Sequence, residues 1–226
     1  MVESRARATN PGAGSLISSG TTTIGLRCSD GVVLGTERRA TMDHFIASKS
    51  TVKLFRIDRH LGATLAGSLG DAQSVIRQMR FEVAFYRSRV GRPIRVEAAA
   101  TVVSNLLSAN RFAPYYGWFV LGGVDPSGPH VFSLDYAGAC SAEDYVSIGS
   151  GSPFVYGVLE EAWKPGLRVT EGVDLALRGL TAAMKRDSAS GDGYAIATIT
   201  DGDYLEVEPD EIRRRRSRLK LADVPG

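Results

Sequence analysis

Residues 18–26 read SSGTTTIGL, with three threonines directly after a glycine. Threonine is β-branched, so this stretch favours the start of a strand. The composition of the chain changes at the same point. Residues 1–20 are rich in Gly, Ser, Ala and Arg and have no hydrophobic period, whereas short β-rich runs begin at Thr21. We therefore expect a folded domain over residues 21–226, preceded by a leader over residues 1–20.

The runs that follow Thr21 alternate with turn residues in the way that hairpins require. TTTIGLRC and VVLGTERRA are separated by SDG, and KLFRI and LGATLAG are separated by DRH. Two stretches with apolar residues three or four positions apart follow and predict helices. Their apolar stripes are Ala72, Ile76, Met79 and Val83 in the first, and Val96, Ala99, Val103 and Leu106 in the second.

The second half of the chain repeats this order of strands and paired helices. It contains the strands YYGWFVLGGV, HVFSLD and CSAEDYVSIG, then the helix PFVYGVLEEAW and a helix with the stripe Val173, Leu177, Leu180 and Met184. YAIATIT, a short strand near Leu205 and a polar helix from Asp210 close the chain. Segregated blocks of this kind predict the α+β class. The architecture expected is a four-layer αββα sandwich of two antiparallel sheets between helix pairs.

Composition and cysteine content limit the environment of the protein. The chain has 226 residues, of which 43% are hydrophobic and 23% charged, as in one ordinary soluble domain. No run approaches the length of a membrane span, and the leader has no apolar core of a secretion signal. Cys28 and Cys140 are too few for a disulfide framework, so we expect two small core residues in a reducing, cytoplasmic environment.

Metal and cofactor chemistry have no support in the sequence. The three histidines, His44, His60 and His130, lie in no metal-binding pattern, and no phosphate-binding P-loop is present. The chain also has no GxSxG elbow of a serine hydrolase. We therefore expect neither a metal nor a cofactor, and any catalysis must use side chains alone.

The threonines offer one route to such catalysis. A hydroxyl becomes an effective nucleophile when a base accepts its proton, and the α-amine of an N-terminal threonine can be that base. A free α-amine has a pKa of about 8, so it is partly neutral at working pH. The amine of Thr21 is blocked while Gly20 is attached to it. Residues 1–20 are thus expected to be a propeptide that is removed autocatalytically at the Gly20–Thr21 bond.

The chain from Thr21 to about Leu221 resembles archaeal proteasome β subunits, which are N-terminal-nucleophile (Ntn) hydrolases. The resemblance is carried by TTTIGL, GTERRATM, FIASKS, KLFRI, LAGSLGDAQ, SNLLS, GSGSPFVYGVLE and KRDSASG, among other collinear stretches. It implies the Ntn-hydrolase fold and a threonine endopeptidase that degrades unfolded proteins to peptides. The partners implied are homo-heptameric β rings stacked with proteasome α-subunit rings, an ATPase ring that acts through the α rings, and unfolded polypeptide as substrate.

The same resemblance assigns catalytic roles. Thr21 matches the nucleophile, and Glu37 and Lys53 match a charged pair beside it that stabilises the alkoxide and keeps the amine neutral. Gly67 matches the residue whose backbone N–H forms the oxyanion hole. Outside this context, Glu37 and Lys53 would be interpreted as exposed strand charges.

Two further groups of residues are implied by the resemblance. Ser150, Asp187 and Ser190 match a polar set around the amine of the nucleophile, although loop capping is an alternative role for them. The substrate site is expected along the strand edges near Thr41 and Gly67, with a side-chain pocket walled by Ala40, Thr51, Leu65 and Leu69. None of these walls is charged, so cleavage after hydrophobic residues is expected.

Two alternatives remain open at this point. The chain could be a non-catalytic, structural β subunit, although the joint presence of Thr21, Glu37, Lys53 and Gly67 argues against it. The basic C-terminal segment, Arg213–Arg216 with Arg218 and Lys220, could bind nucleic acid. No aromatic or base-reading pattern accompanies it. We therefore favour a solvated helix or a subunit contact, and expect neither nucleic acid nor a membrane as a partner.

Overall fold

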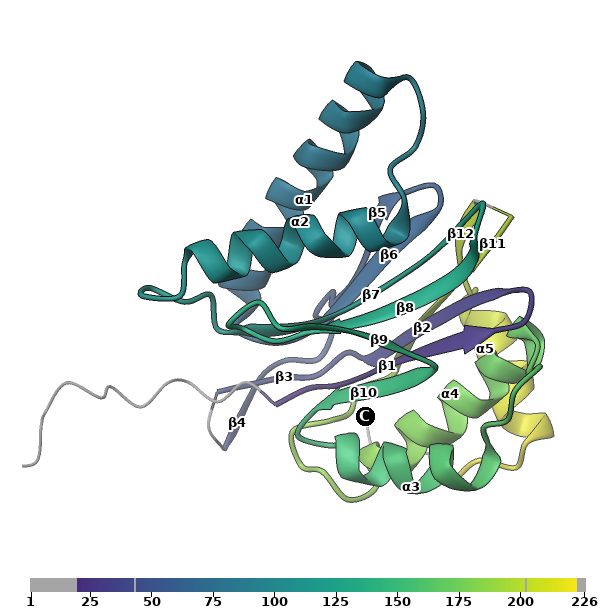
Figure 1. Cartoon of the computed structure of the whole chain (residues 1–226). Coiled ribbons are helices and arrows are strands. Elements are labelled where there is room, and N and C mark those ends of the chain that lie inside the picture. Colours follow the sequence, from purple (N-terminus) through teal and green to yellow (C-terminus); the bar gives the residue numbers. More distant parts are fainter. Residues whose placement is uncertain (1–19, 43, 202, 223–226) are drawn as a thin grey trace, which may run out of the picture.

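Two five-stranded antiparallel sheets pack face to face in the computed structural model, with helices on both outer faces (Figure 1). The structure describes residues 20–42, 44–201 and 203–222. Of the leader expected over residues 1–20, only Gly20 lies within the described residues. The four layers confirm the αββα sandwich predicted from the order of strands and helices.

The first sheet has the spatial order β10-β1-β2-β11-β12. Its strands are β10 (Tyr145–Gly149), β1 (Thr22–Cys28), β2 (Gly31–Glu37), β11 (Tyr194–Thr200) and β12 (Asp203–Glu206). Strand β1 shows how the two faces of this sheet differ in their packing. Ile24 and Leu26 join the core beneath the helices, whereas Gly25 faces the second sheet, where a Cβ would lie 2.5 Å from Val120 Cγ1. The absent side chain allows the sheets to approach closely.

The second sheet has the spatial order β5-β6-β7-β8-β9. Its strands are β5 (Leu54–Asp58), β6 (Leu61–Gly67), β7 (Gly117–Asp125), β8 (Gly128–Leu134) and β9 (Cys140–Glu143). A separate two-stranded hairpin of β3 (Ala40–Met42) and β4 (Phe45–Ser48) projects beside the ends of β1 and β2 (Figure 1). This hairpin was not predicted as a strand pair from the sequence.

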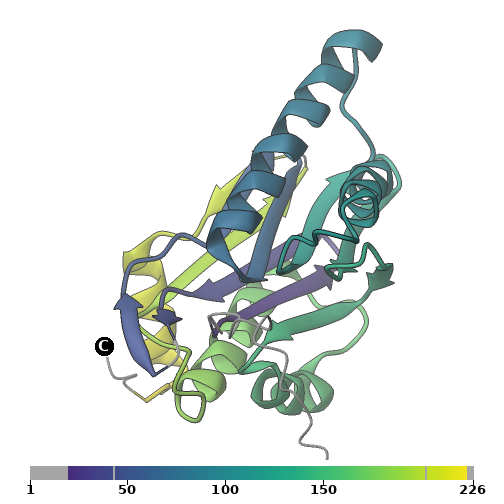
Figure 2. The same ribbon diagram turned by 90° about the vertical axis from the view of Figure 1, so that its left-hand side faces the viewer.

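Helices α1 (Leu69–Val90) and α2 (Val96–Ala109) cover the second sheet, and α3 (Ser152–Ala162) and α4 (Val169–Met184) cover the first. The short α5 (Pro209–Arg218) packs through Ile212 into the core beneath the first sheet. Helix α1 begins after the N-cap Ser68 and ends at Gly91, whose φ of 74° suits a left-handed C-cap. It extends beyond the sheets in both views (Figures 1 and 2).

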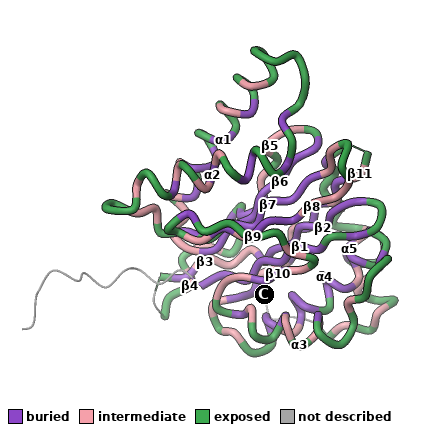
Figure 3. The backbone as a smooth tube through the Cα atoms, in the orientation of Figure 1, coloured by how far each residue is buried: buried purple, intermediate pink, exposed green. Residues whose placement is uncertain are grey.

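Three apolar clusters fill the three interfaces between the four layers, and the central strands are buried along most of their length (Figure 3). The cluster between the sheets includes Val32, Leu34 and Val120. In the described ranges, even the 22-residue α1 is too polar to cross a bilayer, and no other helix combines sufficient length with apolar character.

Three expectations need correction. The run over residues 140–149 is two strands, because the chain passes from the second sheet to the first at Asp144, whose carbonyl accepts a hydrogen bond from Arg27 N at 2.8 Å. On α2, Val96, Ala99 and Val103 are buried as predicted, but the last core position is Leu107, which is fully buried, rather than the half-buried Leu106. Cys28 is buried as expected, but Cys140 is exposed because β9 lies at the sheet edge.

Candidate active site

Thr21 lies directly before β1, still joined to Gly20, and is 2% exposed. Its Oγ1 donates a hydrogen bond to Gly20 O at 2.7 Å, and Gly20 N donates to Thr41 Oγ1 at 3.0 Å. A Cβ added at Gly20 would overlap the Ala189 side chain. The junction is therefore held on both sides, and its packing accepts only glycine before Thr21.

A buried ion pair lies beside this junction. Glu37, the last residue of β2, is 0% exposed, and Lys53, just before β5, is 3% exposed. Lys53 Nζ donates to Glu37 Oε1 and to the Arg39 carbonyl. Glu37 Oε1 also accepts from Thr22 N at 3.2 Å, and Oε2 accepts from Arg39 N at 2.6 Å and Gly191 N at 3.1 Å. Four donors compensate the desolvation of this carboxylate.

Burial perturbs the proton affinity of both partners. It raises the pKa of Glu37, and the charge of Lys53 and the backbone donors oppose that shift. It also lowers the pKa of Lys53, and the charges of Glu37 and Asp187 oppose that shift. For each partner, burial therefore disfavours the charged form, whereas the opposite charge of the other partner favours it.

Ser150, Asp187 and Ser190 form one hydrogen-bonded network. Asp187 Oδ2 accepts from Ser150 Oγ and from Ser190 Oγ, both at 2.6 Å. Ser150 Oγ reaches Thr21 O at 3.4 Å, and Ser190 Oγ lies 2.6 Å from Thr22 Oγ1. The network thus contacts the backbone carbonyl of Thr21 and the side-chain hydroxyl of Thr22.

Gly67 ends β6 at a φ of 120°, a conformation that favours glycine. A Cβ there would lie 2.5 Å from Tyr116 O. Both observations explain why glycine occupies this position. Gly67 lines the same cavity as Thr21.

Eight residues surround that cavity: Gly20, Thr21, Ala40, Thr51, Lys53, Leu65, Gly67 and Leu69. All four predicted pocket walls are among them. Thr41 is not, and contacts Gly20 through its hydroxyl instead. The cavity volume is about 20 Å³, which is room for about one water molecule. A larger cavity of about 730 Å³, beside the loop between α1 and α2, shares none of these residues.

Sequence reasoning missed Arg39 and Gly191, both of which donate backbone hydrogen bonds to Glu37. The adjacency of Arg39 to Glu37 in GTERR was the available signal for the first residue. No local signal could indicate Gly191, because it lies 154 positions from Glu37 along the chain.

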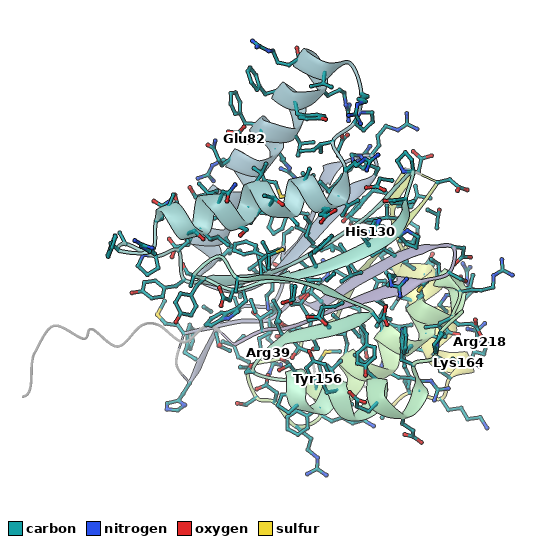
Figure 4. All side chains as sticks on the ribbon, viewed as in Figure 1. Arg39, Glu82, His130, Tyr156, Lys164 and Arg218 are labelled. Atoms are coloured by element: carbon teal, nitrogen blue, oxygen red, sulfur yellow. The ribbon has the colours of Figure 1, made fainter. Side chains whose placement is uncertain are left out.

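The C-terminal arginines are largely neutralised within the chain. Arg215 and Arg218 pair with Asp174 of α4, and Arg213 and Arg214 pair with acidic residues one turn earlier on α5. Arg218 is labelled in Figure 4 beside this helix. Arg215 and Arg218 thus join α5 to α4, whereas the pairs of Arg213 and Arg214 are exposed and lie within α5.

Two antiparallel sheets between helix pairs, with a threonine at the start of a central strand, are the fold of the Ntn hydrolases. Residues 17–199 match the family described as Proteasome subunit. The chain therefore belongs to the proteasome subunit family.

Several archaeal proteins are similar over nearly the whole chain. Proteasome subunit beta of Methanothermobacter thermautotrophicus is 46% identical over 201 residues, which cover 88% of this chain and 96% of that protein. Proteasome subunit beta of Methanothrix thermoacetophila is 48% identical over 194 residues, or 85% and 94% of the two chains. Proteasome subunit beta 1 of Thermococcus onnurineus is 45% identical over 193 residues, or 85% and 95%.

Proposed function

We propose that this chain is a catalytic β subunit of the proteasome core particle, a threonine endopeptidase that degrades unfolded proteins to peptides. The observation that carries the proposal is the cavity shared by Thr21, Lys53 and Gly67, with Lys53 paired to the buried Glu37. Burial of an ion pair costs desolvation free energy. A non-catalytic, structural β subunit has no need of a buried lysine that faces a cavity next to a threonine hydroxyl.

The first reaction is removal of the leader, residues 1–20. Thr21 Oγ attacks the Gly20 carbonyl carbon, the bond from that carbon to Thr21 N breaks, and an ester with a free amine results. Water then hydrolyses the ester, which restores the hydroxyl and releases the Gly20 carboxylate. Support comes from the 2.7 Å hydrogen bond of Thr21 Oγ1 to Gly20 O. Residues 1–19 lie outside the described residues.

The mature reaction uses the amine that processing frees. The amine accepts the proton of Thr21 Oγ as the hydroxyl attacks a substrate carbonyl, and later gives it to the leaving amine. Lys53 stabilises the alkoxide by its positive charge, and Glu37 keeps the buried ammonium charged. The Gly67 N–H is the donor for the oxyanion. Ser150, Asp187 and Ser190 hold the amine through their hydrogen-bonded network.

The cavity beside Thr21 is the proposed side-chain pocket. Its walls Ala40, Thr51, Leu65 and Leu69 are uncharged, so hydrophobic substrate residues are favoured and an unpaired charge is penalised. Gly20 forms part of the lining, so departure of the leader enlarges the space. Extended substrate is proposed to lie along the backbone near Thr41 and Gly67.

Assembly follows from the same proposal. The chain would form homo-heptameric β rings stacked with proteasome α-subunit rings in the cytoplasm, with an ATPase ring supplying unfolded polypeptide through the α rings. Enclosure in such a chamber restricts an unselective protease to chains that have been threaded into it.

The intact mass of the chain after assembly with its α partner tests the proposal. The wild-type chain should lose residues 1–20 and cleave short fluorogenic peptides. Thr21→Ala should assemble, retain the leader and show no activity. Thr23→Ala is a matched control, because Thr23 is a buried threonine in the same run whose hydroxyl bonds Gly35 O and Thr64. Particles that cleave peptides while every β chain keeps its leader would contradict the proposed mechanism, and processed but inactive particles would favour the structural alternative.

A further inference from the structure

Arg39 connects two segments of the site that are far apart in sequence. It lies between β2 and β3, and its backbone holds both members of the buried pair: its N–H donates to Glu37 Oε2, and its carbonyl accepts from Lys53 Nζ. Figure 4 labels Arg39 near the end of the first sheet. None of the proposed catalytic roles involves the Arg39 side chain.

That side chain binds the loop between α4 and β11. Arg39 Nε donates to Asp192 Oδ2 at 2.6 Å, and Nη1 donates to Ser188 O at 2.9 Å. The guanidinium also lies against Gly191, where an added Cβ would overlap it. Arg39 therefore contacts the loop over residues 188–192 through an ion pair, a backbone hydrogen bond and direct packing.

The pair is shielded from water, unlike an ordinary surface ion pair. The side chains of Arg39 and Asp192 are 12% and 2% exposed. Asp192 has a positive φ of 63°, a conformation that a non-glycine residue keeps only where its surroundings hold it. Lys49 Nζ, at 3.7 Å from Asp192 Oδ1, adds a second and mostly exposed cation. An arginine that is shielded from water and donates hydrogen bonds both to a carboxylate and to a backbone carbonyl can hold a loop in one position.

The loop held in this way supplies the rest of the site. Gly191 N donates to Glu37 Oε2, and Ser190 and Asp187 belong to the network around Thr21 and Thr22. Displacement of the loop would therefore remove a hydrogen-bond donor from the Glu37 carboxylate and would move Ser190 and Asp187 at the same time. A displacement of about 1 Å is enough to reduce a catalytic rate substantially.

We propose that Arg39 is a positioning residue. Its ion pair with Asp192 holds residues 187–192 against the Glu37–Lys53 pair, and so fixes the position of this loop relative to the buried pair. The catalytic consequence rests on the proposed function, whereas the structural role of the pair does not.

The experiment compares Arg39→Met, Arg39→Lys and Asp192→Asn in particles assembled with the α partner. Hydrogen exchange by mass spectrometry should show amides of residues 186–194 exchanging about tenfold faster or more in Arg39→Met and Asp192→Asn. In the same samples, kcat for a fluorogenic peptide should fall about tenfold or more while KM stays within about twofold, since Arg39 lies outside the proposed pocket. Arg39→Lys keeps the positive charge but loses the planar guanidinium with its several N–H donors. Its exchange rate and its kcat should therefore lie between those of the wild type and of Arg39→Met.

Gly191→Ala provides an independent variant that retains both charges. Its Cβ would displace the guanidinium, so it should increase exchange in the same segment, and combining it with Arg39→Met should add little. Arg59→Met is the matched control. Arg59 pairs with Asp203 at 2.9 Å, but the two side chains are 66% and 56% exposed, so neither exchange at 186–194 nor kcat should change.

Each outcome decides a separate point. Unchanged exchange in Arg39→Met, with the thermal midpoint of the wild type, would overturn the proposal whatever the peptidase result. Faster exchange with an unchanged kcat would also overturn it, because the loop would then be held without effect on catalysis. A wild-type particle without peptidase activity would contradict the proposed function, and the exchange measurement would still decide whether Arg39 holds the loop.

Discussion

Lys53 Nζ donates a hydrogen bond to Glu37 Oε1, and the two side chains are only 3% and 0% exposed. The carboxylate accepts three further hydrogen bonds from the backbones of Thr22, Arg39 and Gly191. These donors come from the start of β1, the segment between β2 and β3, and the loop before β11. The pair therefore forms only when all three segments are in place, and its charge state depends on the whole site.

Replacement of Lys53 should reduce both activity and stability. Lys53→Met keeps much of the side-chain volume but leaves the Glu37 carboxylate buried without its cation, which costs about 3–5 kcal/mol of unfolding free energy. Peptidase turnover should fall by about 100-fold or more, because an electrostatic group in a desolvated site is lost. Turnover and thermal unfolding of assembled particles measure the two effects. Glu37→Gln should also reduce turnover, because loss of the Glu37 charge leaves burial to lower the pKa of Lys53 further. Near-normal turnover in Lys53→Met would show that this lysine has no catalytic role.

Gly20→Ala should slow processing, because its Cβ would overlap Ala189 and push the scissile bond away from the Thr21 hydroxyl. The measurement is the fraction of uncleaved chain against time after assembly, by intact mass. Ala189→Gly should partly restore the rate in the double variant by removing the overlapping methyl group. Wild-type processing of Gly20→Ala would mean that the junction adopts another conformation during cleavage.

Leu65→Ala should widen the specificity of the proposed pocket. Leu65 is 1% exposed and lines the cavity beside Thr21, so we expect the wild type to cleave faster after Leu than after Trp. Removal of three carbon atoms should increase the rate after Trp relative to Leu, with a stability loss of about 2–5 kcal/mol. Peptides that differ only in the residue before the scissile bond provide the measurement, and Leu65→Val is the graded control. Fastest cleavage after Arg or Asp in the wild type would show that the pocket lies elsewhere.

The two cysteines should differ in reactivity. Burial raises the pKa of the Cys28 thiol to about 12, with Asp30 and Glu171 adding to the shift, so the reactive thiolate is scarce at neutral pH. Cys140 is exposed on β9, although burial of part of its surface raises its pKa as well. Alkylation of the native chain before assembly should label Cys140 first, and both residues should react after denaturation. Peptide mapping reports each site, and rapid native labelling of Cys28 would show that the core beneath the first sheet opens.

Local patterns in the sequence determined most of the architecture. Hairpin turns predicted antiparallel sheets, and the stripes on α1 and α4 identified helix faces that the structure buries, including Ile76, Met79 and Leu177. The G-TTT junction and the collinear motifs indicated the positions of Glu37, Lys53 and Gly67, which line or adjoin one cavity. These signals are local because strand alternation, helical spacing and turn chemistry each depend on only a few neighbouring residues.

Tertiary packing alone decided the features that depend on distant segments. The passage of the chain between sheets at Asp144 and the exposure of Cys140 follow from strand order, which alternation within one run does not specify. The fit of Gly20 against Ala189 and the ion pair of Arg39 with Asp192 join residues more than 150 positions apart. Such contacts form only after both sheets have packed, because the positions of their partners are set by the whole fold rather than by adjacent sequence.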